Sequence, residues 1–168
     1  MNIIQPHRGL VWGFEVLNQR RELIDRFTQP NKVPTQGLDF MIKLALNMVS
    51  PVPAWYFSLF EGDYTPTDDV TAATLPGLAT EITAYTPSTR PLFEPGAVAG
   101  GSASNAADLA EVTFTAEKTV RVVAMSSASA KGSTAGILLS VVRLPSPRTY
   151  PIGSILRAFG APTAVSAN

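Results

Sequence analysis

Hydrophobic and polar positions alternate along much of the chain. In residues 8–18 every second side chain is large and apolar: Leu10, Trp12, Phe14 and Val16. Side chains of an extended chain point alternately to its two sides, so these four would share one face of a strand. Residues 21–28 repeat the strand-like composition, and the polar stretch between them predicts a hairpin turn around Asn18 and Gln19.

Further segments with strand-like patterns follow, at residues 55–61, 79–85, 111–116, 119–128, 136–144 and 154–161. In the first of these, alternation would turn Phe57 and Phe60 to opposite sides of the strand. Residues 119–128 and 136–144 form a second predicted hairpin across a glycine-bearing loop. Five side chains are expected to be buried between the sheets: Trp55, Phe57, Phe114, Val122 and Leu138.

One segment has helical spacing instead. Its apolar residues recur every three or four positions: Leu38, Met41, Ile42, Ala45 and Met48. Thr35 is of a type that caps helices, and Pro51 and Pro53 prevent continuation. The pattern predicts a helix from about residue 36 to 49, with these apolar side chains packed in the core.

Many short strands, frequent turn signals and one early helix are typical of a mainly β protein. We expect an antiparallel two-sheet sandwich, jelly-roll-like, with one α-helix inserted near residues 36–49. The sandwich domain would span residues 9–161, after an N-terminal arm at 1–8 and before a flexible tail at 162–168. The longest apolar stretch, residues 38–49, is interrupted by Asp39, Lys43 and Asn47 and is too short to span a bilayer.

Composition adds that the surface is poor in charge. The 168 residues are 45% hydrophobic and only 15% charged, against about 25% charged in ordinary domains, and the net charge is zero. This balance does not favour nucleic-acid binding, which needs clustered Lys and Arg, but it does favour self-association.

Cysteine is absent, so disulfides and thiolate chemistry are excluded. The first residues have no charged leader before an apolar block, and we expect no secretory signal.

Candidate catalytic groups are few. The one histidine, His7, lies in the predicted arm, where nothing would fix it beside a nucleophile. The Lys-Gly-Ser-Thr stretch at 131–134 has the wrong order for a phosphate-binding loop and is interpreted as a hairpin tip. A sandwich glycosidase would need paired carboxylates such as Glu81 and Glu94, but nothing in the pattern brings these two together. We therefore expect no catalytic residue and no cofactor.

An acidic turn follows the strand at 55–61. Asp63, Asp68 and Asp69 are carboxylates of the kind that bind calcium, but the ligand spacing of a calcium loop is absent. The interpretation that fits better is a solvated acidic turn, and whether these three bind a cation stays open at this stage.

Several stretches together resemble a family of small virion proteins of tailed bacteriophages. The stretches, in chain order, are GLVWGFEVLNQ, QPNKVPTQGLDFMIKLAL, AWYFSLFEGDYTP, TEITAYTPSTRPLFEPG and VTFTAEKTVRVVAMSSASAKGSTAGILLSVVRL. Their shared layout is a hairpin, an N-x-V-x-x-x-G-L helix start, a W-Y-x-x-L-F strand, a Y-x-x-x-x-R-P segment and a closing hairpin. The resemblance covers about residues 9–160 and lies in the ordered set rather than in any single motif.

The resemblance implies a non-enzymatic structural protein, a capsid decoration (cement) protein. Its partners would be the major capsid protein on the outer surface of the virion head and copies of itself, as a dimer or trimer, with no nucleic acid and no membrane. The alternative is a tail-fibre or other receptor-binding component of the same virion. Attachment is expected through the arm and a small-residue loop at 96–110, and the candidate contact residues are Ile3, Ile4, Val98 and Leu109.

Overall fold

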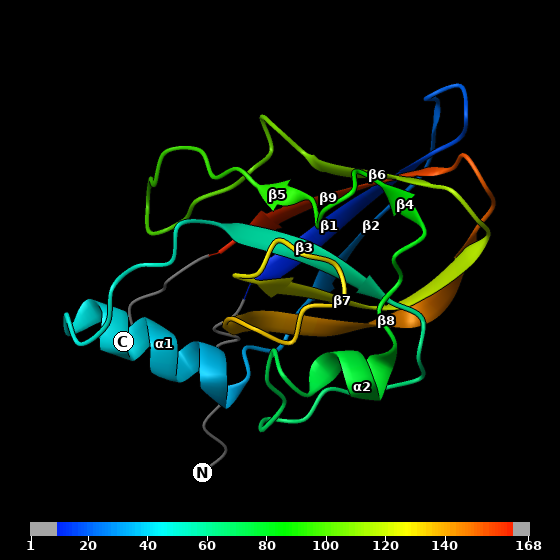
Figure 1. The fold of residues 1–168 in the computed structure, drawn as a ribbon. Coiled ribbons are helices and arrows are strands. Elements are labelled where there is room, and N and C mark those ends of the chain that lie inside the picture. Colours follow the sequence, from blue (N-terminus) through cyan, green and yellow to red (C-terminus); the bar gives the residue numbers. More distant parts are fainter. Residues whose placement is uncertain (1–9, 163–168) are drawn as a thin grey trace, which may run out of the picture.

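The computed structural model describes residues 10–162, which form two antiparallel sheets packed face to face (Figure 1). Helices α1 (Thr35–Ala45) and α2 (Leu75–Ala79) lie on one side of this sandwich. The expected mainly β, two-sheet architecture with an inserted helix is thus confirmed. The predicted arm at 1–8, with Ile3, Ile4 and His7, lies outside the described residues, as does the predicted tail after residue 162.

The first sheet joins the two ends of the described chain. Its strand order is β2 (Leu23–Pro30), β1 (Val11–Leu17), β9 (Ile155–Ala161), β6 (Ala110–Phe114) and β4 (Tyr85–Thr86). The predicted hairpin at residues 8–28 is confirmed as β1 and β2. In its turn, the Asn18 side-chain oxygen accepts hydrogen bonds from the backbone N–H groups of Arg20 at 2.9 Å and Glu22 at 3.0 Å. A short polar side chain therefore replaces the missing backbone partners of the turn.

Two glycines make room for large aromatic side chains where β1 and β9 pair. Gly13 lies opposite Phe159 in the register, and a Cβ at Gly13 would overlap the Phe159 ring. Gly160 lies opposite Trp12, where a Cβ would come within 2.8 Å of the indole. The missing side chains allow both rings to lie flat across the neighbouring strand.

The second sheet contains the hairpin predicted near the C-terminus. Its strand order is β5 (Leu92–Phe93), β3 (Trp55–Phe60), β7 (Lys118–Ser126) and β8 (Leu138–Tyr150). Strand β8 runs six residues past the predicted end at residue 144, through Pro145 and Pro147. The β7–β8 register shifts between Arg143 and Arg148, so Pro145 and Pro147 lie in a bulge where no backbone N–H has to pair with β7.

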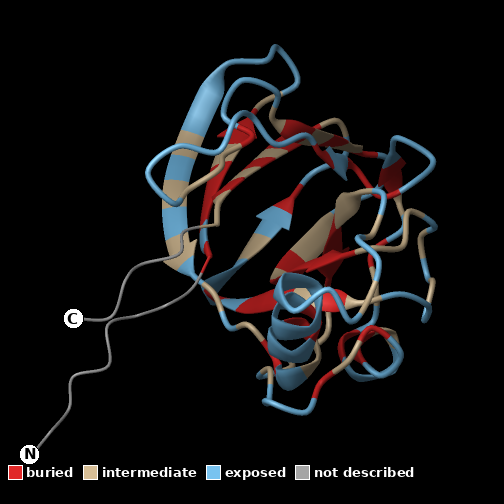
Figure 2. Cartoon of the chain, turned by 90° about the vertical axis from the view of Figure 1, so that its left-hand side faces the viewer, coloured by how far each residue is buried: buried red, intermediate tan, exposed pale blue. Residues whose placement is uncertain are grey.

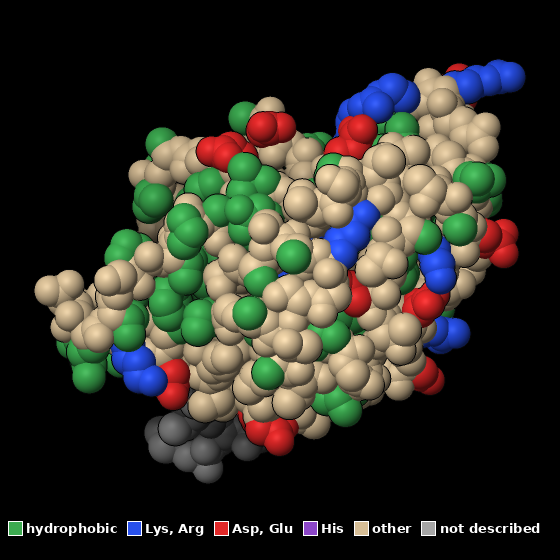
Figure 3. Space-filling view, viewed as in Figure 1, with side chains coloured by type: hydrophobic (Ala, Val, Ile, Leu, Met, Phe, Trp, Pro, Cys, Tyr) green, Lys and Arg blue, Asp and Glu red, His purple; other side chains and the backbone are tan. Residues whose placement is uncertain are grey.

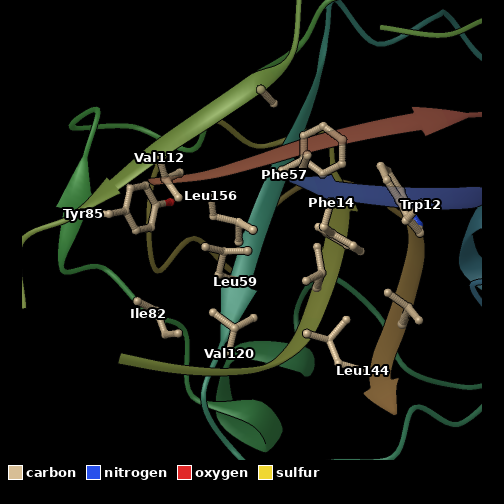
Figure 4. Close-up of a cluster of buried hydrophobic side chains, with 14 of the residues drawn as sticks. Trp12, Phe14, Phe57, Leu59, Ile82, Tyr85, Val112, Val120, Leu144 and Leu156 are labelled. Carbon is tan, nitrogen blue, oxygen red and sulfur yellow. The ribbon is translucent and has the colours of Figure 1, made fainter. Parts of the chain in front are cut away.

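The main core fills the space between the two sheets (Figure 4). Alternation in β1 is confirmed, since Trp12, Phe14 and Val16 are all buried there. Phe57 and Phe114 are buried in the same core, as predicted. The Trp12 and Phe57 rings meet edge to face, with centroids 4.6 Å apart. Aromatic residues from both sheets thus hold the layers together.

A second apolar cluster covers the outer face of the β3–β7–β8 sheet. Phe60 from β3 packs there with Leu75 and Ala79 of α2. Val122 and Leu138 also belong to this cluster, so the prediction that they lie between the sheets is wrong, although both are buried. Trp55 is only partly buried, against the edge of the main core. The error arises because this sheet is covered on both faces, and alternation does not say which face meets the other sheet.

Helix α2 and the segment after it differ from the predicted pattern. The sequence pattern does not predict the short α2, because Pro76 and Gly77 are poor helix formers. The prediction of a strand at residues 79–85 is wrong. In its place, Glu81 forms an isolated bridge to Phe60, and the strand β4 begins only at Tyr85. Tertiary contact with α2 and β3 decides the conformation of this segment.

Candidate interaction surface

Helix α1 buries the face opposite to the one that its apolar pattern suggests. Phe40 is buried and meets the Trp55 ring edge to face at 5.7 Å. Gly37 is buried against β8, where an added Cβ would lie 2.5 Å from the Leu139 carbonyl oxygen. The Gln36 side-chain oxygen accepts hydrogen bonds from the backbone of Ala72 at 3.0 Å and Leu138 at 2.8 Å. These three contacts fix which side of α1 faces the sandwich.

The apolar stripe expected in the core is therefore exposed. Leu38, Met41 and Ile42 are 46%, 41% and 59% exposed, and Ala45 is exposed as well. The prediction that this stripe packs in the core is wrong, because the helix docks through Gly37 and Phe40. We call Leu38, Met41, Ile42, Ala45 and Leu46 the α1 outer face. Figure 2 shows the exposed side of α1, and Figure 3 shows hydrophobic side chains gathering over that end of the molecule.

Both ends of α1 differ from prediction. Thr35 is the first helical residue rather than a cap, and its backbone N–H donates to the Asp68 carbonyl at 2.8 Å. The helix ends at Ala45 rather than near 49, because Asn47 adopts a positive φ of 55° and the Met48 N–H bonds back to the Lys43 carbonyl at 2.8 Å. This is the usual way a left-handed residue closes a helix. Leu46 and Met48 stay 65% and 66% exposed beyond the end.

The loop at 96–110 is anchored at its middle. The Asn105 side chain is buried, donates to the Ala158 carbonyl at 3.1 Å and accepts from the Gly160 N–H at 2.9 Å. Both bonds tie the loop to β9. Of the two predicted contact residues, Val98 is 76% exposed, whereas Leu109 is only partly exposed. Val98 is therefore accessible to a partner, whereas Leu109 is largely shielded from solvent.

A buried ion pair lies beneath the loop between β7 and β8. The Arg90 guanidinium donates to both Glu81 carboxylate oxygens at 2.8 and 2.6 Å, and each side chain is only 3% exposed. Arg90 also donates to the Ala128 and Ser133 carbonyls, both at 3.1 Å, and the Gly132 N–H donates to Glu81 at 2.9 Å. The pair therefore holds both sides of the loop.

Lys131 adds a second attachment for the same loop. Its ammonium group lies 3.6 Å from the Tyr85 ring centroid and donates to the Thr83 carbonyl at 3.0 Å. Burial lowers the pKa of Lys131 and raises the pKa of Tyr85 above its ordinary value. The interpretation of residues 131–134 as a hairpin tip is confirmed, since they lie in the loop between β7 and β8.

Sequence reasoning missed the Arg90–Glu81 pair. The only signal was Arg90 itself, a lone charge in the Y-x-x-x-x-R-P segment of an otherwise uncharged stretch. Both carboxylate oxygens of Glu81 are occupied by Arg90 and Gly132, and Glu94 is exposed. This arrangement does not provide the facing acid and base that a glycosidase needs.

The acidic turn is neutralised by cations of the same chain. Asp63 pairs with Arg143 at 2.6 Å, and Asp68 pairs with Lys32 at 2.6 Å. A hydrogen bond from the Thr67 side chain lowers the pKa of Asp69. Within residues 10–162, no group of three or more His, Cys, Asp or Glu side chains is placed to hold a metal ion.

Comparison with known proteins gives no relative: no protein-family model matches the chain, and no curated protein is significantly similar to it. Among the described residues, no helix is both long and apolar enough to cross a membrane.

Proposed function

We propose that this chain is a non-enzymatic structural protein of a tailed-phage virion, a capsid decoration protein that binds the major capsid protein on the outer head surface. The observation that carries the proposal is the surface of the sandwich. Large apolar side chains stand exposed on α1, at Met48 and at Val98, while the buried charges Arg90 and Glu81 satisfy each other. Exposed apolar surface of this kind is typical of proteins that assemble.

The sandwich supplies a rigid body for such a role. The β7–β8 loop is held by the buried ion pair, and the loop carrying Val98 is anchored through Asn105. A contact residue on an anchored loop loses little conformational entropy on binding, which favours attachment. The arm residues Ile3 and Ile4 remain the other predicted contacts with the shell.

The proposal is tested with phage particles assembled without this protein. Purified chain is added back, bound copies are counted on gels, and the particles are reconstructed by electron microscopy. We expect density at repeated positions on the head shell and greater resistance of the heads to heat. Density on the tail instead would support the receptor-binding alternative and overturn the proposal. Particles that bind no chain would overturn both.

A further inference from the structure

The α1 outer face points directly away from the sandwich. Successive residues of a helix turn by about 100°, so Ile42 lies nearly opposite the buried pair Gly37 and Phe40. Leu38 and Leu46 lie on either side of Ile42, one turn away in each direction along the helix. Within the part of the chain that the structure describes, nothing covers these side chains, which are 46% to 65% exposed. The face is therefore an apolar ridge that is open to a partner.

One border of this face is charged. Asp39 and Lys43 lie one turn apart on the same side of Ile42, 57% and 50% exposed, and their charged groups are 3.8 Å apart. In an antiparallel pair of α1 helices related by a twofold axis, the same border of both helices lies on the same side. Asp39 of each copy would then face Lys43 of the other. The border is thus complementary to its own antiparallel copy.

We propose that two copies of this chain pair through the α1 outer face, with the helices antiparallel and the twofold axis level with Met41, midway between Asp39 and Lys43. Four of its five side chains are 41% to 65% exposed, so a pair that covers both faces lies near the lower limit for a specific interface, about 1,000 Å². The chain's own segments 1–9 and 163–168 are the other candidates. Neither contains an Asp or Glu, so neither matches the charged border with both signs as a second α1 does. The pairing does not depend on the position of the protein in the virion.

The first test compares two exposed isoleucines. Ile42 is 59% exposed at the centre of the face, and Ile152 is 60% exposed in the turn between β8 and β9. Sedimentation velocity of the full chain from 1 to 100 µM, without particles, measures the dimer. We expect Ile42→Asp to raise the dissociation constant at least 100-fold, because twofold symmetry places the change twice in the interface. Ile152→Asp should leave the constant unchanged.

The second test uses the border charges. Asp39→Lys and Lys43→Asp should each weaken the dimer about tenfold, since each places like charges across the interface. An equimolar mixture of the two variants should form a mixed dimer at least as well as the wild-type chain. A chain that stays monomeric throughout the concentration range overturns the proposal. The proposal is also overturned if Ile42→Asp leaves the dissociation constant of the dimer unchanged. The same holds if the mixture of the two charge variants dimerises no more tightly than either variant alone.

Discussion

The Arg90–Glu81 pair shows how a buried charge is tolerated in this sandwich. A charge removed from water is costly unless its partner and its remaining donors are satisfied. Arg90 meets this condition with the Glu81 carboxylate, the Ser126 hydroxyl and two loop carbonyls. The pair therefore specifies the position of the β7–β8 loop. Other ion pairs of the chain, such as Asp63 with Arg143, lie at the surface and are screened by water.

This contrast gives a matched prediction for two carboxylates. Glu81→Ala leaves the Arg90 charge buried and should lower the free energy of unfolding by about 3–5 kcal/mol. Asp63→Ala removes the partner of an exposed arginine and should change it by less than about 1 kcal/mol. Urea unfolding of both variants at pH 7 measures the difference. Equal losses would mean that burial of the Arg90 pair has no energetic consequence.

Tyr150 gives a second residue-scale prediction, in alkali. Its ring stacks on Phe114 at 4.9 Å, and its hydroxyl has no hydrogen-bond partner within residues 10–162. Burial raises the pKa of Tyr150 to about 12 from an ordinary value of 10. Because the pKa is higher in the folded state, the unfolded chain loses its Tyr150 proton first. The free energy of unfolding is therefore unaffected by this group below pH 10 and decreases between pH 10 and 12. By pH 11 the decrease should be about 1 kcal/mol.

Tyr150→Phe removes that titration and an unsatisfied hydroxyl. The variant should be as stable as the wild-type chain or more stable at pH 7, and it should lose less stability between pH 9 and pH 11. Tyr85, whose pKa burial also raises, titrates in both proteins and so does not affect the comparison. Urea unfolding at each pH provides the values. Parallel pH profiles for the two proteins would contradict the assignment.

At the scale of elements, the two helical glycines have opposite environments. A Cβ at Gly37 would lie 2.5 Å from the Leu139 carbonyl oxygen, whereas a Cβ at Gly77 in α2 would meet nothing within 4 Å. Alanine favours a helix over glycine by about 1 kcal/mol. Gly77→Ala should therefore be neutral or stabilising. Gly37→Ala should cost about 1–3 kcal/mol, because α1 must move away from β8. Thermal unfolding of the two variants compares them, and a stabilising Gly37→Ala would show that α1 does not dock closely.

The same elements show what the sequence could and could not predict. Strands β1, β3 and β7 were predictable because alternation and bulky side chains mark a half-buried strand locally. The buried face of α1 was not, because its docking depends on a glycine and one aromatic rather than on the longer apolar stripe. The 3.6-residue periodicity predicts a helix with an apolar face, but it does not tell whether that face is buried in the same chain or exposed. The Arg90–Glu81 pair was hidden for a related reason: it joins a proline-rich segment to a loop about 40 residues away.

At the scale of the whole molecule, the chain combines a well-packed sandwich with an apolar outer surface. Between the sheets the core is continuous, so the fold does not need the α1 outer face for its own stability. The net charge is zero, so long-range repulsion between copies is small. Val98 does not belong to the α1 outer face, so pairing through α1 would leave this exposed residue, on the loop anchored through Asn105, as a separate contact for a second partner. A decoration protein needs two kinds of contact of this sort, one to its neighbours and one to the shell.

The proposed attachment of the chain to the particle can be tested at its first residues. Residues 1–7 include Ile3 and Ile4, and burying each against another chain would contribute roughly 1.5–3 kcal/mol before ordering costs. Seven extended residues reach about 23 Å, far enough to meet a neighbouring subunit. Deleting residues 1–7 should leave the unfolding free energy of the sandwich unchanged but lower the number of copies bound to heads. Because these contacts are apolar, binding of the intact chain should change little between 0.05 and 0.5 M salt, whereas a basic clamp would weaken steeply. A truncated chain that decorates heads as fully as the intact one would show that the arm plays no part in attachment.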